Sequence, residues 1–451
     1  MPQMTSQLVL PFEDRGEAPR TGRSAEAQTA PGETEGSGTS GLMERVASRP
    51  NMLVAYRRVR RNKGSPGIDG QRVEDLATWL QANWEGVGEQ LLAGTYHPTA
   101  VRRQTIPKPG GGERELGIPT VLDRLIQQAL LQVLQPIFDR TFSDHSYGFR
   151  PGRRAHDALR RAQGYIQEGR RWVVDVDLER FFDRVNWDIL MGRLSKRIED
   201  KRVLRLIRRY LEAGVMVNGV VIERHEGTPQ GGPISPLLAN ILLDEVDREL
   251  EKRNHAFVRY ADDGNVYVRS HRAGERVMAQ LRRLYGRLRL QVNETKSAVA
   301  RVRKRKFLGF SFWVAPGKEI RIRIAKNALV TMKERVRRLT RRTCGQNLGK
   351  IVEDLRTYLL GWKGYFRLAE TPRIFHDLDK WIRHRLRVIQ LKQWNRGRTA
   401  YRELVARGLS PLLAARVAKY TRRWWKTGAM ALHIALPNKL FDQMGLPRLG
   451  A

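Results

Sequence analysis

The sequence predicts an α+β protein whose strands are followed by a helical C-terminal region. Apolar residues over 120–137 recur at helical spacing and predict a buried helix that closes near Pro136. The short segment 172–178, rich in β-branched residues, predicts a buried strand. Two β-type runs joined by Ala-Asp-Asp-Gly predict a hairpin over 255–270. Beyond residue 325 the pattern becomes helical, which completes the α+β assignment.

The helical C-terminal region contains three amphipathic stripes. They predict a small bundle with Arg and Lys on its outer faces and one basic surface. Three helices that are merely solvated would give the same pattern, because Lys and Arg normally occupy exposed positions. The apolar positions of the stripes are Leu329, Met332, Val336 and Leu339, then Leu355, Tyr358, Leu359 and Trp362, then Leu378, Ile382, Leu386 and Ile389.

The charge of the chain indicates a polyanionic partner. Its 451 residues include 83 Lys and Arg against 47 Asp and Glu, a formal net charge of +36. Residues 301–451 hold 36 of these basic residues and 9 of the acidic ones, so the excess is concentrated in the last third. This asymmetry argues against an ordinary metabolic enzyme and predicts a region that grips phosphates. Residues 1–41 are rich in Gly, Ser, Thr, Ala and Pro and predict a disordered arm.

Several protein classes are excluded by composition. The single cysteine, Cys344, rules out a disulfide scaffold or a zinc ribbon and suits a reducing compartment. No apolar run approaches the ~18–20 residues of a membrane-spanning helix, and the first residues have no basic segment typical of a signal peptide. We therefore expect a soluble, cytoplasmic protein with no membrane partner.

Carboxylates occur at the ends of the predicted strands. Asp177 closes the strand over 172–178, with Asp175 two residues earlier on the same face, and Asp262 and Asp263 occupy the hairpin turn. Clustered carboxylates are costly unless a cation neutralises them, and hard oxygen ligands select Mg²⁺. Two such ions about 3.5–4 Å apart serve nucleotidyl transfer. The spacing alone leaves open a structural role in turns or in ion pairs with Arg259 and Arg180.

An ordered series of motifs resembles those of reverse transcriptases. It narrows to the reverse transcriptase–maturases encoded by bacterial group II introns, and most closely to the compact class C type without an endonuclease domain. The series spans about residues 42–440. Its motifs are NKGSPGIDG (62–70), IPKPGGGERELGIP (106–119), SYGFRP (146–151), VDVDLERFFD (174–183), GTPQGGPISPLLAN (227–240), YADD (260–263), NETKS (293–297) and FLGF (307–310).

This resemblance implies the right-hand fold of a polymerase. Fingers with an N-terminal extension would span residues 42–170, and a palm with an antiparallel sheet and some fingers parts would span 171–315. An α-helical thumb, or X maturase domain, would follow over 316–395. The basic segment 396–451 resembles the family's DNA-binding region.

The resemblance also assigns roles to individual residues. Asp177, Asp262 and Asp263, with the backbone carbonyl of Leu178, would hold two Mg²⁺ ions. Phe182 would screen the sugar 2′-carbon, unless it is a core residue. Lys296 would protonate departing pyrophosphate or simply contact phosphate. The nucleotide would also meet Lys108, Arg114 and Gln230, and the primer would be gripped by Phe307, Leu308, Gly309 and Phe310.

The expected activity is RNA-directed DNA polymerisation coupled to binding of a group II intron RNA, assisting splicing and retromobility. The expected partners are this intron RNA, an RNA template with a DNA primer, target DNA and dNTPs. The RNA-binding surface would include Arg337, Arg338, Arg341 and Arg342. Two alternatives stay open: a maturase that binds RNA without polymerising, and a related reverse transcriptase of a CRISPR or other defence system. A bacterial cytoplasmic, nucleoid-associated location follows from the same resemblance.

Overall fold

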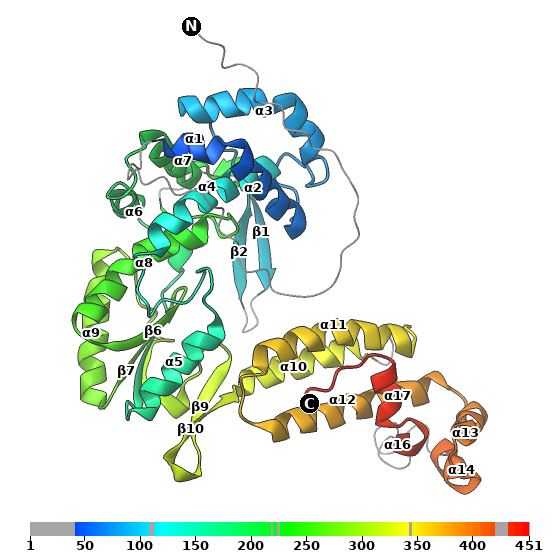
Figure 1. Cartoon of the computed structure of the whole chain (residues 1–451). Helices are drawn as coiled ribbons and strands as arrows, with labels where there is room; N and C mark the ends of the chain where they lie inside the picture. The colour runs from blue at the N-terminus through cyan, green and yellow to red at the C-terminus, as the bar shows by residue number, and fades with distance from the viewer. Residues whose placement is uncertain are drawn as a thin grey trace. The chain divides into compact units, whose positions relative to one another are not determined.

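A computed structural model describes residues 41–107, 112–217, 220–222, 226–341, 345–419 and 432–450. The chain divides into two compact units, each taken separately below. The first unit comprises residues 1–158 and 172–299, and the second comprises residues 159–171 and 300–451. Figure 1 shows the elements of each unit along the chain.

The first unit begins with helices and contains two sheets. Its helices are α1 (Leu42–Ala47), α2 (Arg49–Asn62), α3 (Leu76–Ala93), α4 (Val121–Asp139), α6 (Trp187–Leu194), α7 (Lys201–Glu212), α8 (Ser235–Lys252) and α9 (His271–Arg287). Its strands are β1 (Val101–Pro107), β2 (Glu113–Ile118), β3 (Trp172–Val176), β4 (Val215–Val217), β5 (Val220–Ile222), β6 (Ala256–Tyr260) and β7 (Asp263–Val268). Helix α5 (Ala155–Gln167) and strand β8 (Ala298–Arg301) cross the boundary between the units.

One four-stranded sheet has the order β6-β7-β3-β8 and carries the candidate site. Strands β6 and β7 form the predicted hairpin, and β3 pairs antiparallel with β7. The central strands are rich in Val, and Val174 of β3 and Val266 of β7 are buried. Helix α9 packs on this sheet against β3 and β7. The second sheet has the order β2-β1-β4-β5.

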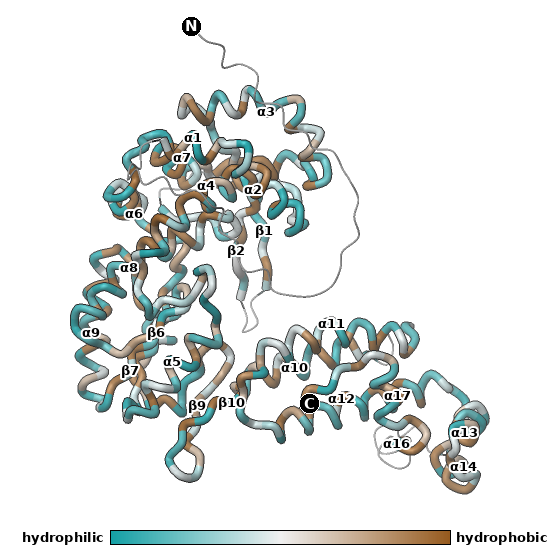
Figure 2. Tube along the Cα trace, in the orientation of Figure 1, coloured by the Kyte–Doolittle hydropathy of each residue, from teal (hydrophilic) through white to brown (hydrophobic). Residues whose placement is uncertain are grey.

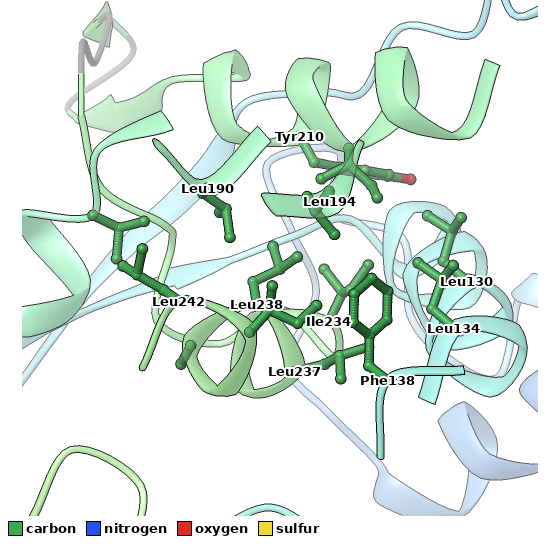
Figure 3. Packing of buried hydrophobic residues seen from close by; sticks show 14 of the residues in the cluster. Leu130, Leu134, Phe138, Leu190, Leu194, Tyr210, Ile234, Leu237, Leu238 and Leu242 are labelled. Carbon is green, nitrogen blue, oxygen red and sulfur yellow. The ribbon is translucent and has the colours of Figure 1, made fainter. Parts of the chain in front are cut away.

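The hydrophobic core of the first unit lies between four helices. Figure 3 shows side chains from α4, α6, α7 and α8 meeting around Leu238. Leu130, Leu134, Leu190 and Leu242 are all fully buried there. Helix α8 therefore connects this core to the hairpin that follows it in the chain. Because close packing confines the buried side chains of α8, this helix gives a rigid start to the β6–β7 hairpin that follows it.

The second unit consists of a two-stranded hairpin and a set of helices. Strands β9 (Phe310–Val314) and β10 (Ile320–Ile324) pair antiparallel. The helices are α10 (Lys326–Leu339), α11 (Leu348–Phe366), α12 (Pro372–Gln393), α13 (Gly397–Ala406), α14 (Pro411–Lys419), α16 (Leu432–Ala435) and α17 (Asn438–Gln443). In Figure 2 these helices alternate hydrophobic and hydrophilic positions along their length. No described helix is long and apolar enough to cross a bilayer.

The strand, the hairpin and the three C-terminal helices are confirmed at their predicted positions. Two details were wrong. Helix α4 continues through Pro136 to Asp139, because a proline so close to the end removes one hydrogen bond only. The third bundle helix, α12, also buries Arg383 and Arg387 instead of exposing them. Their burial depends on polar partners in distant parts of the sequence.

Candidate polymerase active site

The three candidate aspartates lie at the ends of adjacent strands. Asp177 directly follows β3, and Asp262 and Asp263 lie at the turn between β6 and β7. The last pair of the β3–β7 ladder joins Val176 to Gly264, so one further step sets Asp177 opposite Asp263. Residues opposite each other in antiparallel strands have Cβ atoms about 4.5–5.5 Å apart. The backbone register thus sets Asp177 beside Asp263 at one end of this sheet.

Asp177 is fixed by the loop over 293–297, which carries the NETKS motif. The Asp177 amide donates to Ser297 Oγ at 3.0 Å, and the Asn293 amide donates to the Asp177 carbonyl at 2.8 Å. Lys296 Nζ lies 3.6 Å from Asp177 Oδ1, with both side chains partly exposed. Leu178 is buried and bridges to Val292. The structure therefore brings together the candidate catalytic residues Asp177, Leu178 and Lys296.

The turn that carries Asp262 and Asp263 is strained. Ala261 has φ +58°, a left-handed conformation that is unfavourable for a residue with a Cβ atom. Its carbonyl accepts a hydrogen bond of 2.9 Å from Arg259 Nη1. Such strain persists only where surrounding contacts fix the backbone. The Arg259 guanidinium supplies one of those contacts.

Arg259 is the centre of a buried polar network. Its guanidinium donates to both carboxylate oxygens of Asp247 at 2.6–2.9 Å, to Asn240 Oδ1 at 2.8 Å and to Ser146 Oγ at 2.8 Å. All four side chains are at most 3% exposed. Burial opposes the charge of Arg259, but the Asp247 carboxylate outweighs it and raises the pKa of Arg259 above its usual value. The network connects α8, the catalytic turn and the loop over 146–151.

That loop packs directly on the catalytic turn. The Tyr147 amide donates to the Arg259 carbonyl, and Asn240 Nδ2 donates to the Gly148 carbonyl, both at 2.9 Å. A Cβ atom on Gly148 would lie 2.1 Å from the Ala261 amide nitrogen, closer than real atoms approach. Only glycine therefore fits at position 148. The physical role of the SYGFRP motif is therefore to pack against the strained turn and to hold its backbone through hydrogen bonds.

The candidate nucleotide-binding residues Phe182 and Gln230 belong to two segments in contact. The Thr228 amide donates to the Phe182 carbonyl at 2.7 Å, and the Gly117 amide of β2 donates to the Gln230 carbonyl at 2.9 Å. Phe182 is half-buried, whereas its neighbour Phe181 is 3% exposed. This places Phe181 in the core, whereas Phe182 packs against the core with part of its ring exposed.

Of the two charged nucleotide-binding candidates, Arg114 belongs to a described strand and Lys108 does not. Arg114 lies on β2, opposite Ile106 of β1 and three residues before Gly117. The strand that carries Arg114 is thus hydrogen-bonded to the Gln230 turn. Lys108 lies outside the described residues, between the two strands.

The predicted primer-grip residues form a tight turn in the second unit. Phe307 and Phe310 exchange two backbone hydrogen bonds of 2.9 Å. Leu308 and Gly309 between them both have positive φ, +50° and +78°, as a type I′ turn requires. Phe307 and Phe310 are buried, and Tyr365 of α11 donates to the Leu308 carbonyl at 3.0 Å. The two aromatic rings anchor the turn, so its exposed part is the tip.

The predicted RNA-binding arginines lie at the end of α10. Arg337, Arg338 and Arg341 are exposed, while Arg342 lies outside the described residues. The Arg337 guanidinium lies 5.8 Å from the ring centre of Trp381, which Arg385 approaches from 5.4 Å. Lys333 Nζ also lies 5.9 Å from this ring centre, so three cations contact Trp381 through cation–π interactions.

The donor set of the site suits Mg²⁺, because it consists of carboxylate oxygens on adjacent strand ends. Among the residues that the structure describes, no three acidic, histidine or cysteine side chains converge closely enough to hold an ion. Carboxylates at such short backbone spacing repel one another, so convergence requires a cation. Asp177 is meanwhile paired with Lys296.

Sequence reasoning missed the residues that support the site. Arg259 was considered only as a possible ion-pair partner of the aspartates, whereas it binds Asp247 and Asn240. Asn240 and Asp247 are seven residues apart and therefore share one face of α8. Two polar residues at that spacing, on the face of α8 that also carries the buried Leu243 and Leu250, are a signal that could have indicated a buried partner.

Comparison with known proteins agrees with this geometry. Residues 106–312 match the family model for reverse transcriptase (RNA-dependent DNA polymerase), and residues 329–408 match that for the group II intron maturase-specific domain. The chain thus contains a reverse transcriptase domain followed by a group II intron maturase-specific domain. The two matched segments contain the aspartate-bearing sheet and the helices from α10 to α13 respectively.

Two curated relatives share this region. Over 216 residues the chain is 38% identical to Protein YkfC of Escherichia coli, which covers 46% of this chain and 57% of that one. Over 255 residues it is 35% identical to group II intron-encoded protein LtrA of Lactococcus lactis, covering 55% and 42%. The chain thus spans about half the length of these relatives. A solved partial Cas6-RT-Cas1–Cas2 complex is 26% identical, with a TM-score of 0.36, and covers 54% of this chain and 42% of that one.

The buried network makes a testable prediction about stability. Arg259→Met leaves the Asp247 carboxylate buried and unpaired, so we expect the free energy of unfolding to fall by about 3–5 kcal/mol. Asp247→Leu should cost a similar amount, and the double variant should cost much less than the two together. Urea denaturation measures all three. Arg248→Met, which breaks an exposed pair on the same helix, is the control and should cost at most about 1 kcal/mol. Additive single effects would contradict the coupling.

Proposed function

We propose that the protein is an RNA-directed DNA polymerase that also binds its intron RNA. The placement of Asp177 opposite Asp263, with Asp262 beside it in a strained and supported turn, carries this proposal. Nucleotidyl transfer needs positioned reactants and stabilised charge more than covalent chemistry by the protein. Carboxylates at the ends of central strands in a rigid sheet meet that need. RNA template, DNA primer and dNTPs are the corresponding substrates.

Asp177, Asp262, Asp263 and the Leu178 carbonyl would hold two Mg²⁺ ions. These ions would supply a lowered pKa for the attacking 3′-hydroxyl and neutralisation of the leaving pyrophosphate. Lys296 adds a positive charge next to Asp177 and can donate a proton from Nζ to the pyrophosphate oxygen. The Arg259 network keeps the catalytic turn in place while charge develops, so no reorganisation is required at that moment.

The nucleotide would be selected beside the turn over 228–231. The half-buried Phe182 ring would exclude a 2′-hydroxyl by its volume. Gln230, held by β2, would line the same pocket, and Arg114 and Lys108 would bind the triphosphate.

The second unit would bind the intron RNA and target DNA. Its support is the match to the maturase-specific domain together with the concentration of basic residues beyond residue 300. Such a surface reads A-form RNA through backbone phosphates and shape. The proposal includes assistance to splicing and mobility of the intron, and a place in the bacterial cytoplasm with nucleic acid of the nucleoid.

Removal of one carboxylate tests the polymerase. Asp262→Asn should reduce Mg²⁺-dependent primer extension on an RNA template by at least about 10²–10³-fold, because charge in the transition state loses its counterweight. Binding of the RNA should stay unchanged. Asp188→Asn, the same substitution at an exposed carboxylate on α6, is the matched control. Extension by Asp262→Asn at the wild-type rate would leave a maturase that binds RNA without polymerising.

The sugar filter can be tested separately. Phe182→Ala should lower the ratio of kcat/KM for dNTPs over rNTPs by at least about tenfold, since discrimination rests on the volume of the ring. Phe182→Tyr retains the ring and should keep the ratio. A ratio that is identical in wild type and Phe182→Ala would assign the ring to packing.

The RNA-binding surface gives a salt-dependent prediction. Replacing Arg337, Arg338 and Arg341 by Gln should weaken RNA binding and flatten the slope of log K against log salt by about 0.7–0.9 per lost phosphate contact. Removal of three exposed arginines from α9, at Arg272, Arg276 and Arg283, is the charge-matched control. Equal slopes for the two triple variants would place the RNA elsewhere.

A further inference from the structure

An open cavity of about 890 Å³ lies within the second unit along one face of α12. Helix α12 contributes residues at helical spacing, and α16, α17 and the segment after α17 close the other side. Basic side chains dominate the lining, which includes Arg373, Lys380, Arg383, Arg387 and Arg448, with His376, His384 and His433. The acidic residues of the lining are Asp377 and Asp379. The cavity is therefore strongly cationic.

Part of this charge is already neutralised. Arg383 pairs with Asp379 at 3.0 Å and with Asp442 at 2.9 Å, and Arg448 pairs with Asp442. Asp379 also accepts hydrogen bonds from the amides of Leu449 and Gly450 at 2.9 and 3.0 Å. These contacts fix the wall of the cavity and neutralise Arg383 and Arg448.

Arg387 is a buried cation of the lining that takes part in none of these ion pairs. It is 9% exposed, and its guanidinium donates to the Leu436 carbonyl and to Asn438 Oδ1, both at 2.8 Å and both uncharged. Among the described residues no carboxylate lies within ion-pair distance of Arg387. Burial, and then the neighbouring Arg383, lower the pKa of Arg387. A nearly buried guanidinium without a counter-ion is costly unless an anion completes the site.

The rim of the cavity adds exposed cations around this buried one. Arg373 and Lys380 lie on the same face of α12, and neither forms an ion pair within the described part of the chain. A buried guanidinium with cations at the rim matches the chemistry of phosphate, whose oxygens accept several charged donors at once. The cavity is also far larger and more open than one phosphate group requires.

We propose that this cavity binds backbone phosphates of an RNA strand, with Arg387 at its floor and Arg373 and Lys380 at its rim. The size of the cavity favours a strand over a small free anion. Helix α12 lies inside the segment that matches the maturase-specific domain. The inference rests on the proposed function, in that it names a binding site for the RNA of that proposal.

The test uses the full chain and a 30-nucleotide single-stranded RNA of mixed sequence. We expect R373Q/K380Q to weaken RNA binding and to lower the slope of log K against log salt by about 1.4, or 0.7 for each lost phosphate contact. R373K/K380R keeps both charges and should keep the wild-type slope. R272Q/R276Q removes two exposed charges from α9 and should also keep it. Primer extension at saturating template should be equal in all four proteins, which separates this site from the polymerase.

The outcomes separate the alternatives. If wild type extends primers and binds RNA, but R373Q/K380Q has the slope of R272Q/R276Q, the cavity proposal is wrong. If wild type fails to extend primers, the proposed polymerase function fails instead, and the slopes still decide the cavity. Isothermal titration calorimetry with inorganic pyrophosphate tests whether the cavity binds a small anion instead. Binding of pyrophosphate that R387Q or R373Q/K380Q abolishes, with unchanged RNA binding, would assign the cavity to a small anion and overturn the RNA proposal.

Discussion

The catalytic sheet depends on one buried ion pair, between Arg259 of β6 and Asp247 of α8. Its donors reach α8, the catalytic turn and the loop over 146–151, so these three segments and the β6–β7 hairpin form one structure. A buried pair of this kind contributes little net stability by itself, because desolvation offsets attraction. Its value here is geometric. It maintains a left-handed backbone at Ala261, and the two aspartates that follow inherit their positions from that residue.

The same use of buried arginine occurs in the second unit with different partners. Arg383 is neutralised by Asp379 and Asp442, whereas the guanidinium of Arg387 contacts two neutral oxygens and the ring of Phe441 but no carboxylate among the described residues. Arg383 therefore links α12 to Asp442 through ion pairs, whereas the positive charge of Arg387 is not neutralised by a carboxylate among the described residues. A basic protein can thus distribute its excess in two ways: on exposed faces, where solvent screens it, or in a cavity, where a low dielectric strengthens its field.

Much of the fold and the site followed from the sequence, and for local reasons. Strand β3 and the β6–β7 hairpin were predicted because β-branched runs and a turn signal are contained within a few residues. The motif residues Asp177, Asp262 and Asp263 were placed at strand ends by the same signals. Arg259, Asp247 and Arg387 could not be assigned in this way. Their partners are distant in sequence, and a buried arginine looks the same as an exposed one in a single chain.

The contact between Gly148 and Ala261 has a consequence for redesign of this protein. The two backbones approach so closely that position 148 can accept no side chain while the backbone of Ala261 stays in place. Loop and turn must therefore change together, as a unit that is exchanged whole. A transplanted SYGFRP loop would accordingly need its matching turn, the α8 face that carries Asn240 and Asp247, and the strand that ends at Asp177.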